Sequence, residues 1–148
     1  MAVPKNTSRH IFIVDDDEDD RDFLADALLD VDPDAIIRQL EDGMYLMKSL
    51  LESKAVVPDL IFLDINRPGK SGLECLREIK MQDGNLKYVN VIMLSTSSGP
   101  SDIESARELG ASFYAVKPNS FEVMRLFLSE VMKMDWNLLD NRKKFRLI

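Results

Sequence analysis

Short runs of apolar residues alternate along this chain with longer stretches whose apolar residues recur at helical spacing. The short runs have the length and composition of buried strands, and they lie at residues 11–14, 35–40, 60–63, 91–94 and 113–116. The stretches between and after them carry apolar faces with a period of three to four residues, within 23–31, 47–51, 73–79, 103–109 and 124–131. Five strands that alternate with five helices predict an α/β domain whose parallel sheet is covered by helices on both faces.

The prolines and one glycine fall where this pattern needs connections. Gly110 follows the fourth helical stretch, where a helix should end, and Pro100 or Ser101 stands where that helix should begin. The prolines outside the N-terminal segment all lie between predicted elements: Pro33, Pro58, Pro68, Pro100 and Pro118. We expect an N-terminal arm at 1–8, one domain at 9–133, and an extension at 134–148 that either continues the last helix or folds back.

Composition narrows the class of protein. A chain of 148 residues with 45% apolar residues can bury one domain core. The net charge of −7 argues against a nucleic-acid-binding surface, since the basic stretch at 142–146 is short and terminal. Cys75 is the only cysteine, which excludes an internal disulfide, and no apolar run has membrane-spanning length. We expect a soluble cytoplasmic protein without a DNA-binding domain and without a membrane partner.

Polar residues follow the predicted strands directly. The first run ends in Asp15, Asp16 and Asp17, the third in Asp64, the fourth in Ser95 and the fifth in Lys117. Ligands of open parallel sheets bind beyond the carboxyl ends of the strands. The sequence therefore predicts one site that combines carboxylates, a hydroxyl and an ammonium group.

The residue types in this site favour phosphoryl chemistry. Adjacent carboxylates repel one another unless a cation neutralises them, and oxygen ligands without His or Cys select a hard ion. Mg²⁺ fits best, because it takes one or two carboxylates and leaves other positions to water and phosphate oxygens. Ser95 and Lys117 offer a hydroxyl donor and a positive charge, and the Asp64 carboxylate can accept a phosphoryl group as an acyl phosphate.

The acidic run, with seven acids between Asp15 and Asp22, has two simpler interpretations. In the first, the acids do no more than cap the first helix and complement its dipole. This interpretation does not explain why polar groups follow four different strands. A calcium loop would match acids at Asp15, Asp17, Asp19 and Asp26. A strand precedes this run, however, and an acid stands where such a loop needs glycine.

Four motifs together resemble the receiver domain of two-component response regulators. They are VDDDEDDR at 14–21, LDINRPGKSG at 63–72, MLST at 93–96 and YAVKP at 114–118. The resemblance covers residues 9–133. It implies a flavodoxin-like (CheY-like) fold, in which a five-stranded parallel sheet of order 2-1-3-4-5 carries five helices on both faces.

The resemblance also implies roles for single residues. Asp64 would be the phosphoacceptor and would ligate Mg²⁺ together with Asp16, while Asp15 would assist through water and Asn66 would add its backbone carbonyl. Ser95 would bind a phosphoryl oxygen and act as a switch residue. Two further residues complete the implied site: Lys117, which would pair with the phosphate, and Tyr114, which would be the aromatic switch.

The function implied is a phosphorylation switch rather than a turnover enzyme, with self-phosphorylation and autodephosphorylation as its only reactions. A sensor histidine kinase or a phosphotransfer protein would donate the phosphoryl group. The output would be another protein, or a homodimer through the face of the fourth helix, fifth strand and fifth helix.

The connections at 84–88 and 97–100 and the segment around Trp136 resemble single-domain regulators paired with phytochrome-type kinases. Arg67 and Ser71 depart from the common family pattern without removing a residue that has an assigned role.

Two rivals stay open at this point. A phosphatase of the haloacid dehalogenase class also uses Asp, Mg²⁺, Ser or Thr, and Lys, but it would place its nucleophile after the first strand in a DxDx[TV] pattern. Here Asp15 and Asp17 are followed by Glu18, and Asp64 would have no role. The second rival is a receiver-like interaction module that no longer accepts phosphate.

Overall fold

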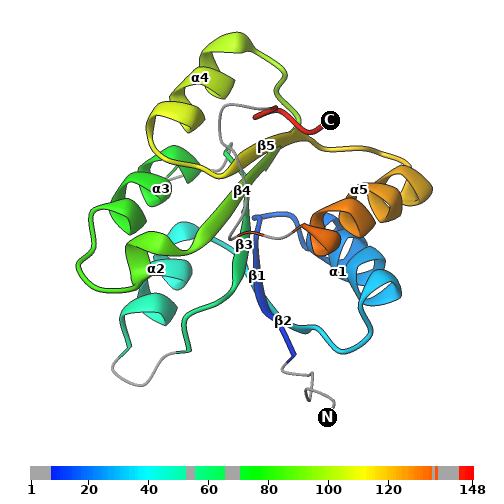
Figure 1. Cartoon of the computed structure of the whole chain (residues 1–148), viewed down its shortest axis with the longest axis horizontal. Coiled ribbons are helices and arrows are strands. Elements are labelled where there is room, and N and C mark those ends of the chain that lie inside the picture. The colour runs from blue at the N-terminus through cyan, green and yellow to red at the C-terminus, as the bar shows by residue number, and fades with distance from the viewer. Residues whose placement is uncertain (1–7, 53–55, 66–70, 135, 137–143) are drawn as a thin grey trace.

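The computed structural model describes residues 8–52, 56–65, 71–134, 136 and 144–148. Within them, five parallel strands form one sheet of order β2-β1-β3-β4-β5 (Figure 1). The strands are β1 (His10–Val14), β2 (Ile36–Leu40), β3 (Leu60–Leu63), β4 (Asn90–Ser95) and β5 (Phe113–Val116). The helices are α1 (Glu18–Val31), α2 (Gly43–Leu51), α3 (Gly72–Lys80), α4 (Pro100–Glu108) and α5 (Phe121–Lys133), with a short 3₁₀ turn at Leu86–Tyr88. The predicted fold class and strand order are confirmed.

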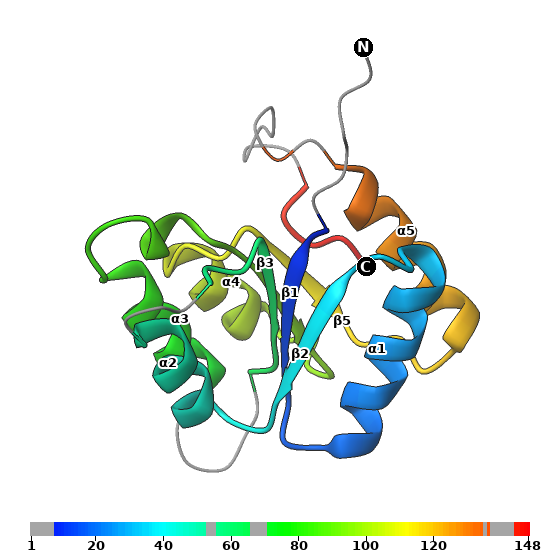
Figure 2. The ribbon, with the colours of Figure 1, turned by 90° about the horizontal axis from the view of Figure 1, so that it is seen from below.

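The helices cover both faces of the sheet. Helices α1 and α5 pack on one face, and α2, α3 and α4 lie on the other (Figures 1 and 2). Because successive side chains of a strand point to opposite faces, Ile11 and Ile13 enter the core under α1 and α5, whereas Phe12 and Val14 enter the other core. Two apolar cores therefore sandwich the sheet. None of the helices in the described part of the chain is long and apolar enough to cross a bilayer.

The sequence prediction was wrong about the burial of one strand and one helix position. The run at 35–40 was expected to be a buried strand, but β2 is an edge strand that pairs only with β1 among the described strands, and Ile36 is 49% exposed. Leu51 was expected on the apolar face of α2 and is 56% exposed. In both cases the apolar side chain lies outside the two cores.

Side chains at the helix ends explain where the helices begin and stop. Asp17 caps α1 by accepting hydrogen bonds from the backbone amides of Asp19 and Asp20, and its neighbours add acids to the first turn. Ser71, the departure from the family pattern, forms a capping box with Glu74 at the start of α3. After α4, Gly110 adopts φ +99°, a left-handed conformation that glycine takes without strain.

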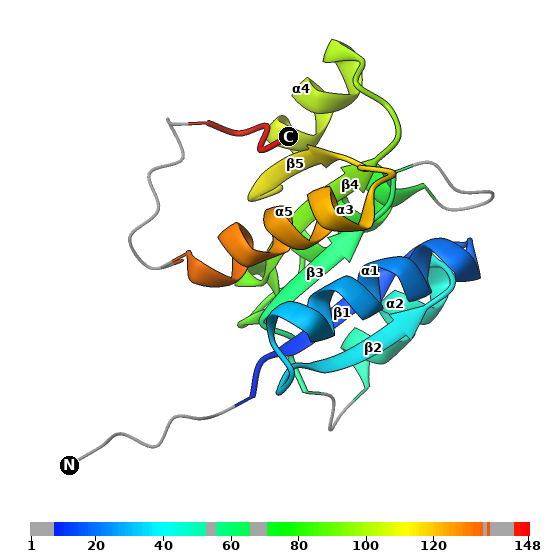
Figure 3. The same cartoon turned by 90° about the vertical axis from the view of Figure 1, so that its right-hand side faces the viewer.

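The end of the chain returns to the sheet. Helix α5 ends at Lys133, and residues Phe145–Ile148 lie beside the outer edge of β5 (Figure 3). The amide of Tyr114 donates to the carbonyl of Phe145 at 3.0 Å, and the amide of Leu147 donates to the carbonyl of Tyr114 at 2.8 Å. The amide of Val116 donates to the carbonyl of Ile148 at 3.1 Å. These bonds extend the parallel pairing beyond β5.

Candidate functional site

The register of the central strands brings two aspartates together. Val14 pairs with Leu63, so Asp15 and Asp64 each follow the last residue of neighbouring parallel strands. The backbone amide of Asp64 donates to the carbonyl of Val14 at 3.1 Å, which continues the ladder by one residue. Both side chains are nearly fully buried, with 5% of Asp15 and 6% of Asp64 exposed.

A third carboxylate completes an acidic cluster. One oxygen each of Asp15, Asp16 and Asp64 can be chosen so that all three lie within 4.8 Å of one another, with Asp16 exposed to solvent. Carboxylate oxygens alone make up this donor set, which suits a hard divalent cation rather than zinc or copper. The arrangement therefore fits divalent metal binding. Asn66, the fourth predicted ligand, lies outside the described residues.

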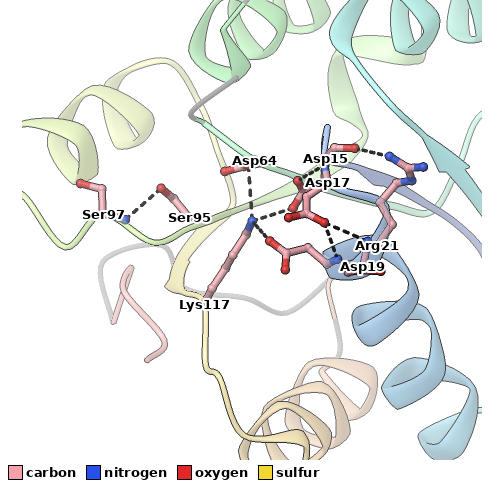
Figure 4. A network of polar contacts seen from close by, with 9 residues as sticks. Asp15, Asp17, Asp19, Arg21, Asp64, Ser95, Ser97 and Lys117 are labelled. Carbon is pink, nitrogen blue, oxygen red and sulfur yellow. Dashed lines mark hydrogen bonds and ion pairs between the residues drawn. The ribbon is translucent and has the colours of Figure 1, made fainter. Parts of the chain in front are cut away.

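The Lys117 ammonium group is the positive charge that faces this cluster. Its Nζ lies 2.6 Å from Oδ2 of Asp15 and 3.4 Å from Oδ2 of Asp64 (Figure 4). Strand β5 aims it there, because the backbone amide of Lys117 donates to the carbonyl of Ser95 at 2.8 Å, one residue beyond the β4–β5 pairing. The structure thus brings together the predicted ends of four strands.

The environment of Lys117 favours its charged form. Burial by itself would lower the pKa of the ammonium group, since a charge loses solvation in the protein. Hydrogen bonding to Asp15, the negative charges of Asp64 and Asp15, and a contact with Asp20 outweigh burial and raise the pKa above its ordinary value. Lys117 therefore stays protonated at neutral pH and offsets part of the carboxylate repulsion.

Asp20 is a member of this site that the sequence reasoning missed. Its Oδ2 lies 3.1 Å from Nζ of Lys117, and its side chain is half exposed. The one signal for it in the sequence was its position in the first turn of the helix that follows the acidic end of β1. Asp17 and Asp19 do other work, since the carboxylate of Asp17 caps the helix and the amide of Asp19 donates to it at 2.9 Å (Figure 4).

The two predicted switch residues lie on one hydrogen-bonded path. The buried hydroxyl of Ser95 accepts a hydrogen bond from the amide of Ser97 at 3.1 Å (Figure 4). The hydroxyl of Tyr114, which is fully buried, donates to the carbonyl of Ser97 at 2.7 Å. Burial raises the pKa of Tyr114, although hydrogen bonding with Ser95 and Ser97 acts in the opposite direction. Ser97 could not be identified from the sequence, because its contacts with Ser95 and Tyr114 are made by its backbone amide and carbonyl.

Comparisons with known proteins agree with this geometry. A profile of the response regulator receiver domain matches residues 11–128. The chain is 31% identical over 126 residues to response regulator Rcp1 of Synechocystis sp. (strain ATCC 27184 / PCC 6803 / Kazusa). The matched region covers 82% of this chain and 85% of Rcp1. It spans less than half the length of the next curated relatives that it matches.

Solved structures give the same result. The phosphorylated cyanobacterial phytochrome response regulator RcpA superposes with a TM-score of 0.80 at 29% identity, covering 90% of this chain and 98% of RcpA. The Mn²⁺-bound form of Rcp1 gives a TM-score of 0.76 at 26% identity, covering 89% of this chain and 97% of Rcp1. Chemotaxis protein CheY4 of Vibrio cholerae supports the fold alone, with a TM-score of 0.71 at 24% identity over 84% of this chain and 99% of CheY4.

The sequence match, the sheet order and the acidic cluster all lead to one conclusion. The cluster fits a phosphorylation site, and none of these similar proteins supports the phosphatase alternative. A phosphatase of that class would also need Asp17 in the pocket, whereas its carboxylate caps α1. The chain belongs to the response regulator receiver domain family.

Proposed function

We propose that Asp64 is the phosphoacceptor of a two-component phosphorelay. An oxygen of its carboxylate attacks the phosphorus atom of a phosphohistidine or a small phosphodonor, and a new O–P bond forms. The P–N or P–O bond of the donor breaks, and its electron pair leaves with the donor. The product is an acyl phosphate. The observation that carries this proposal is the convergence of Asp15, Asp16, Asp64 and the Lys117 ammonium group.

The two buried acids hold the Lys117 ammonium group at different distances. Oδ1 of Asp15 accepts the amide of Asp17 at 3.0 Å, and its Oδ2 holds Lys117 at 2.6 Å. The contact of Asp64 with the same ammonium group is longer, at 3.4 Å. Asp15 therefore holds the ammonium group in place beside Asp64.

Asp15, Asp16 and Asp64 would hold Mg²⁺, and the carbonyl of Asn66 stays a prediction for a fourth ligand. When bound, the ion would reduce the repulsion between the negative carboxylates and the phosphoryl oxygens. Lys117 supplies a fixed positive charge to the phosphoryl oxygens, and the Ser95 hydroxyl supplies a donor for one of them. The existence of a Mn²⁺-bound form of Rcp1 supports the binding of a divalent ion by this chain.

The biological role that fits is a switch rather than a turnover enzyme. A sensor histidine kinase or a phosphotransfer protein would deliver the phosphoryl group, and the similarity to phytochrome response regulators supports that class of partner. The altered Ser95 and Tyr114 would then change the face of α4, β5 and α5, where an output protein or a second copy would bind. The cytoplasm is the compartment in which we place this exchange.

The test is intact-mass measurement after incubation with acetyl phosphate and Mg²⁺. We expect one phosphate on the wild-type chain and none on Asp64→Asn, which removes the nucleophilic charge while keeping the shape. Asp19→Asn is the matched control, because it makes the same change on an exposed acid of the same run, and it should be labelled normally.

Three outcomes would contradict the proposal. Labelling of Asp64→Asn at the wild-type level would move the acceptor elsewhere, and an unlabelled wild-type chain would favour the interaction module without phosphate. Multiple turnover of p-nitrophenyl phosphate by the wild-type chain would favour a phosphatase.

A further inference from the structure

The outer edge of β5 is occupied by the chain's own C-terminal residues, which we call the tail strand (Phe145–Ile148). Three backbone hydrogen bonds join it to Tyr114 and Val116, and Tyr114 and Arg146 form a parallel bridge. The edge of a sheet offers unpaired amide and carbonyl groups that an extended segment can satisfy. The tail strand is thus bound to β5 in the way that an added peptide strand would be.

Phe145 anchors this strand in the core. Its side chain is 7% exposed and belongs to the same apolar cluster as Tyr114 and Ala106 of α4. The guanidinium group of Arg107, also on α4, lies 4.9 Å from the centre of the Phe145 ring. Docking of the tail strand therefore depends on the positions of both β5 and α4.

Tyr114 connects the tail strand to the candidate phosphorylation site. Its backbone holds Phe145 and Leu147, while its side-chain hydroxyl donates to the carbonyl of Ser97 at 2.7 Å. The amide of Ser97 donates in turn to the hydroxyl of Ser95 at 3.1 Å. Ser97 also donates from its hydroxyl to Asp102 of α4 at 2.7 Å. A shift of Ser95 or Ser97 thus reaches both surfaces on which the tail strand rests.

We propose that the tail strand is an intramolecular ligand of the β5 edge and that phosphorylation of Asp64 weakens its docking. This inference rests on the proposed function, because it needs a phosphoryl group on Asp64 that accepts a hydrogen bond from the Ser95 hydroxyl. Drawing Ser95 toward Asp64 displaces Ser97, and the Tyr114 hydroxyl then loses the acceptor that fixes it against the tail strand. The edge freed in this way can accept an extended segment of an output protein.

Coupling of this kind is reciprocal. If phosphorylation weakens tail docking, then loss of tail docking must favour the phosphorylated arrangement by the same free energy. Variants of the tail strand should therefore change the phosphorylated fraction of Asp64, although no tail residue belongs to the acidic cluster.

Amide hydrogen exchange of the full chain, with and without acetyl phosphate and Mg²⁺, tests the proposal. We expect protection of the Leu147 and Val116 amides to fall by about fivefold or more when Asp64 is phosphorylated, the lower range of usual allosteric coupling. Asp64→Asn should show no change. Unchanged protection in a sample that intact mass shows to be phosphorylated overturns this inference alone, whereas absence of phosphate overturns the proposed function.

Side-chain variants separate docking from coupling. Phe145→Ala should lose protection at Leu147 without phosphodonor and should raise the phosphorylated fraction at a limiting donor concentration. Lys144→Ala, an exposed neighbour, is the matched control and should do neither. Tyr114→Phe should keep the tail docked but abolish its response to the phosphodonor. An equal response in Tyr114→Phe contradicts the path through Ser97.

The same exchange data would also fit a tail strand that pairs with β5 of a second copy of the chain. Light scattering distinguishes the two arrangements. A wild-type chain that is monomeric with protected Leu147 and Val116 amides supports the intramolecular ligand. A dimer that dissociates in Phe145→Ala shows that the tail strand is exchanged between copies, and this outcome overturns the proposal.

Discussion

Lys117 carries the positive charge on which the acidic pocket depends. Its ammonium group contacts Asp15, Asp20 and Asp64, and the side chain is only 13% exposed. In this setting each of the two buried carboxylates relies on a partner that water cannot replace. Removal of the lysine would leave three neighbouring negative charges without their shared cation, so Lys117 should contribute to stability as well as to phosphate binding.

Lys117→Met should lower the free energy of unfolding at pH 7 by about 2–4 kcal/mol in buffer without divalent ions, because a buried ion pair loses one partner. The folded chain raises the pKa of Lys117. The stabilisation is therefore fully present below the unfolded pKa of about 10.4 and is lost as pH rises through the higher folded pKa. Urea unfolding of both chains between pH 7 and 11 measures how the difference in their free energies of unfolding changes with pH.

The control for this experiment is Lys48→Met, which makes the same change on an exposed lysine of α2. The free energy of unfolding of Lys48→Met should stay close to that of the wild type from pH 7 to 11. If the difference for Lys117→Met grows rather than narrows above pH 10, the assignment of the raised pKa to these carboxylates fails.

At the scale of elements, the first residue of α3 lies closely against Asp64 and Ile65. The amide of Gly72 donates to the carbonyl of Ile65 at 3.0 Å. A Cβ added to Gly72 would overlap the carbonyl oxygen of Asp64 and would lie 2.9 Å from Cα of Ile65. These neighbours are backbone atoms, which cannot rotate away as a side chain can. Gly72 therefore lets α3 begin directly against the residue that we propose as phosphoacceptor.

Gly72→Ala should lower the free energy of unfolding by about 2–4 kcal/mol, because the backbone around Asp64 must shift to make room. Gly99→Ala is the control, since its Cβ would meet only the hydroxyl of Ser97, at an ordinary 3.5 Å. Its cost should stay below about 1 kcal/mol. Urea unfolding gives both values, and phosphate incorporation should fall in Gly72→Ala alone. Equal costs for the two variants would contradict the close approach at Asp64.

The same elements show what could be predicted from the sequence. Buried parallel strands leave a strong signal, because both faces are apolar and the polar residue after each run marks the carboxyl end. This is why Asp15, Asp64, Ser95 and Lys117 could be placed at one edge of the sheet. The exposure of Ile36 could not be predicted, since it depends on which strand lies at the edge rather than on local composition.

The contributions of Asp20, Ser97 and the tail strand were also missed, for a shared physical reason. Asp20 contacts Lys117 from the first turn of α1, Ser97 contacts Tyr114 through its backbone carbonyl, and Phe145–Ile148 pairs with β5 across 31–33 residues of sequence. Local patterns predict which residues form strands and helices. They carry little information about contacts between distant segments.

At the scale of the whole molecule, the candidate site and the tail strand lie on different parts of one sheet. The acidic cluster lies beyond the carboxyl ends of β1 and β3, and the tail strand covers the outer edge of β5. Strands β4 and β5 join the two, because Ser95 ends β4, Lys117 directly follows β5 and Tyr114 lies within β5. A local change of charge can therefore alter a surface formed by other elements without unfolding the domain.

Metal binding at the acidic cluster should be visible in the stability of the whole domain. A ligand that binds only the folded chain stabilises it by RT ln(1 + [L]/Kd), which is about 2.7 kcal/mol at a hundredfold excess over Kd. We expect Mg²⁺ to raise the free energy of unfolding of the wild-type chain in this logarithmic manner, and Mn²⁺ to do the same. Urea unfolding at increasing metal concentration and constant ionic strength measures this gain in the free energy of unfolding.

Two aspartate variants make this measurement specific to the cluster. Asp16→Asn removes the exposed member of the cluster and should move the stabilisation to at least tenfold higher metal concentration, on the order of 1.4 kcal/mol at a fixed concentration. Asp19→Asn removes the same charge from the same acidic run outside the cluster and should follow the wild-type curve. If both variants shift equally, general screening of the acidic surface explains the effect and the cluster is not the metal site. If only Asp16→Asn shifts, the ion binds where the ends of β1 and β3 bring the carboxylates together.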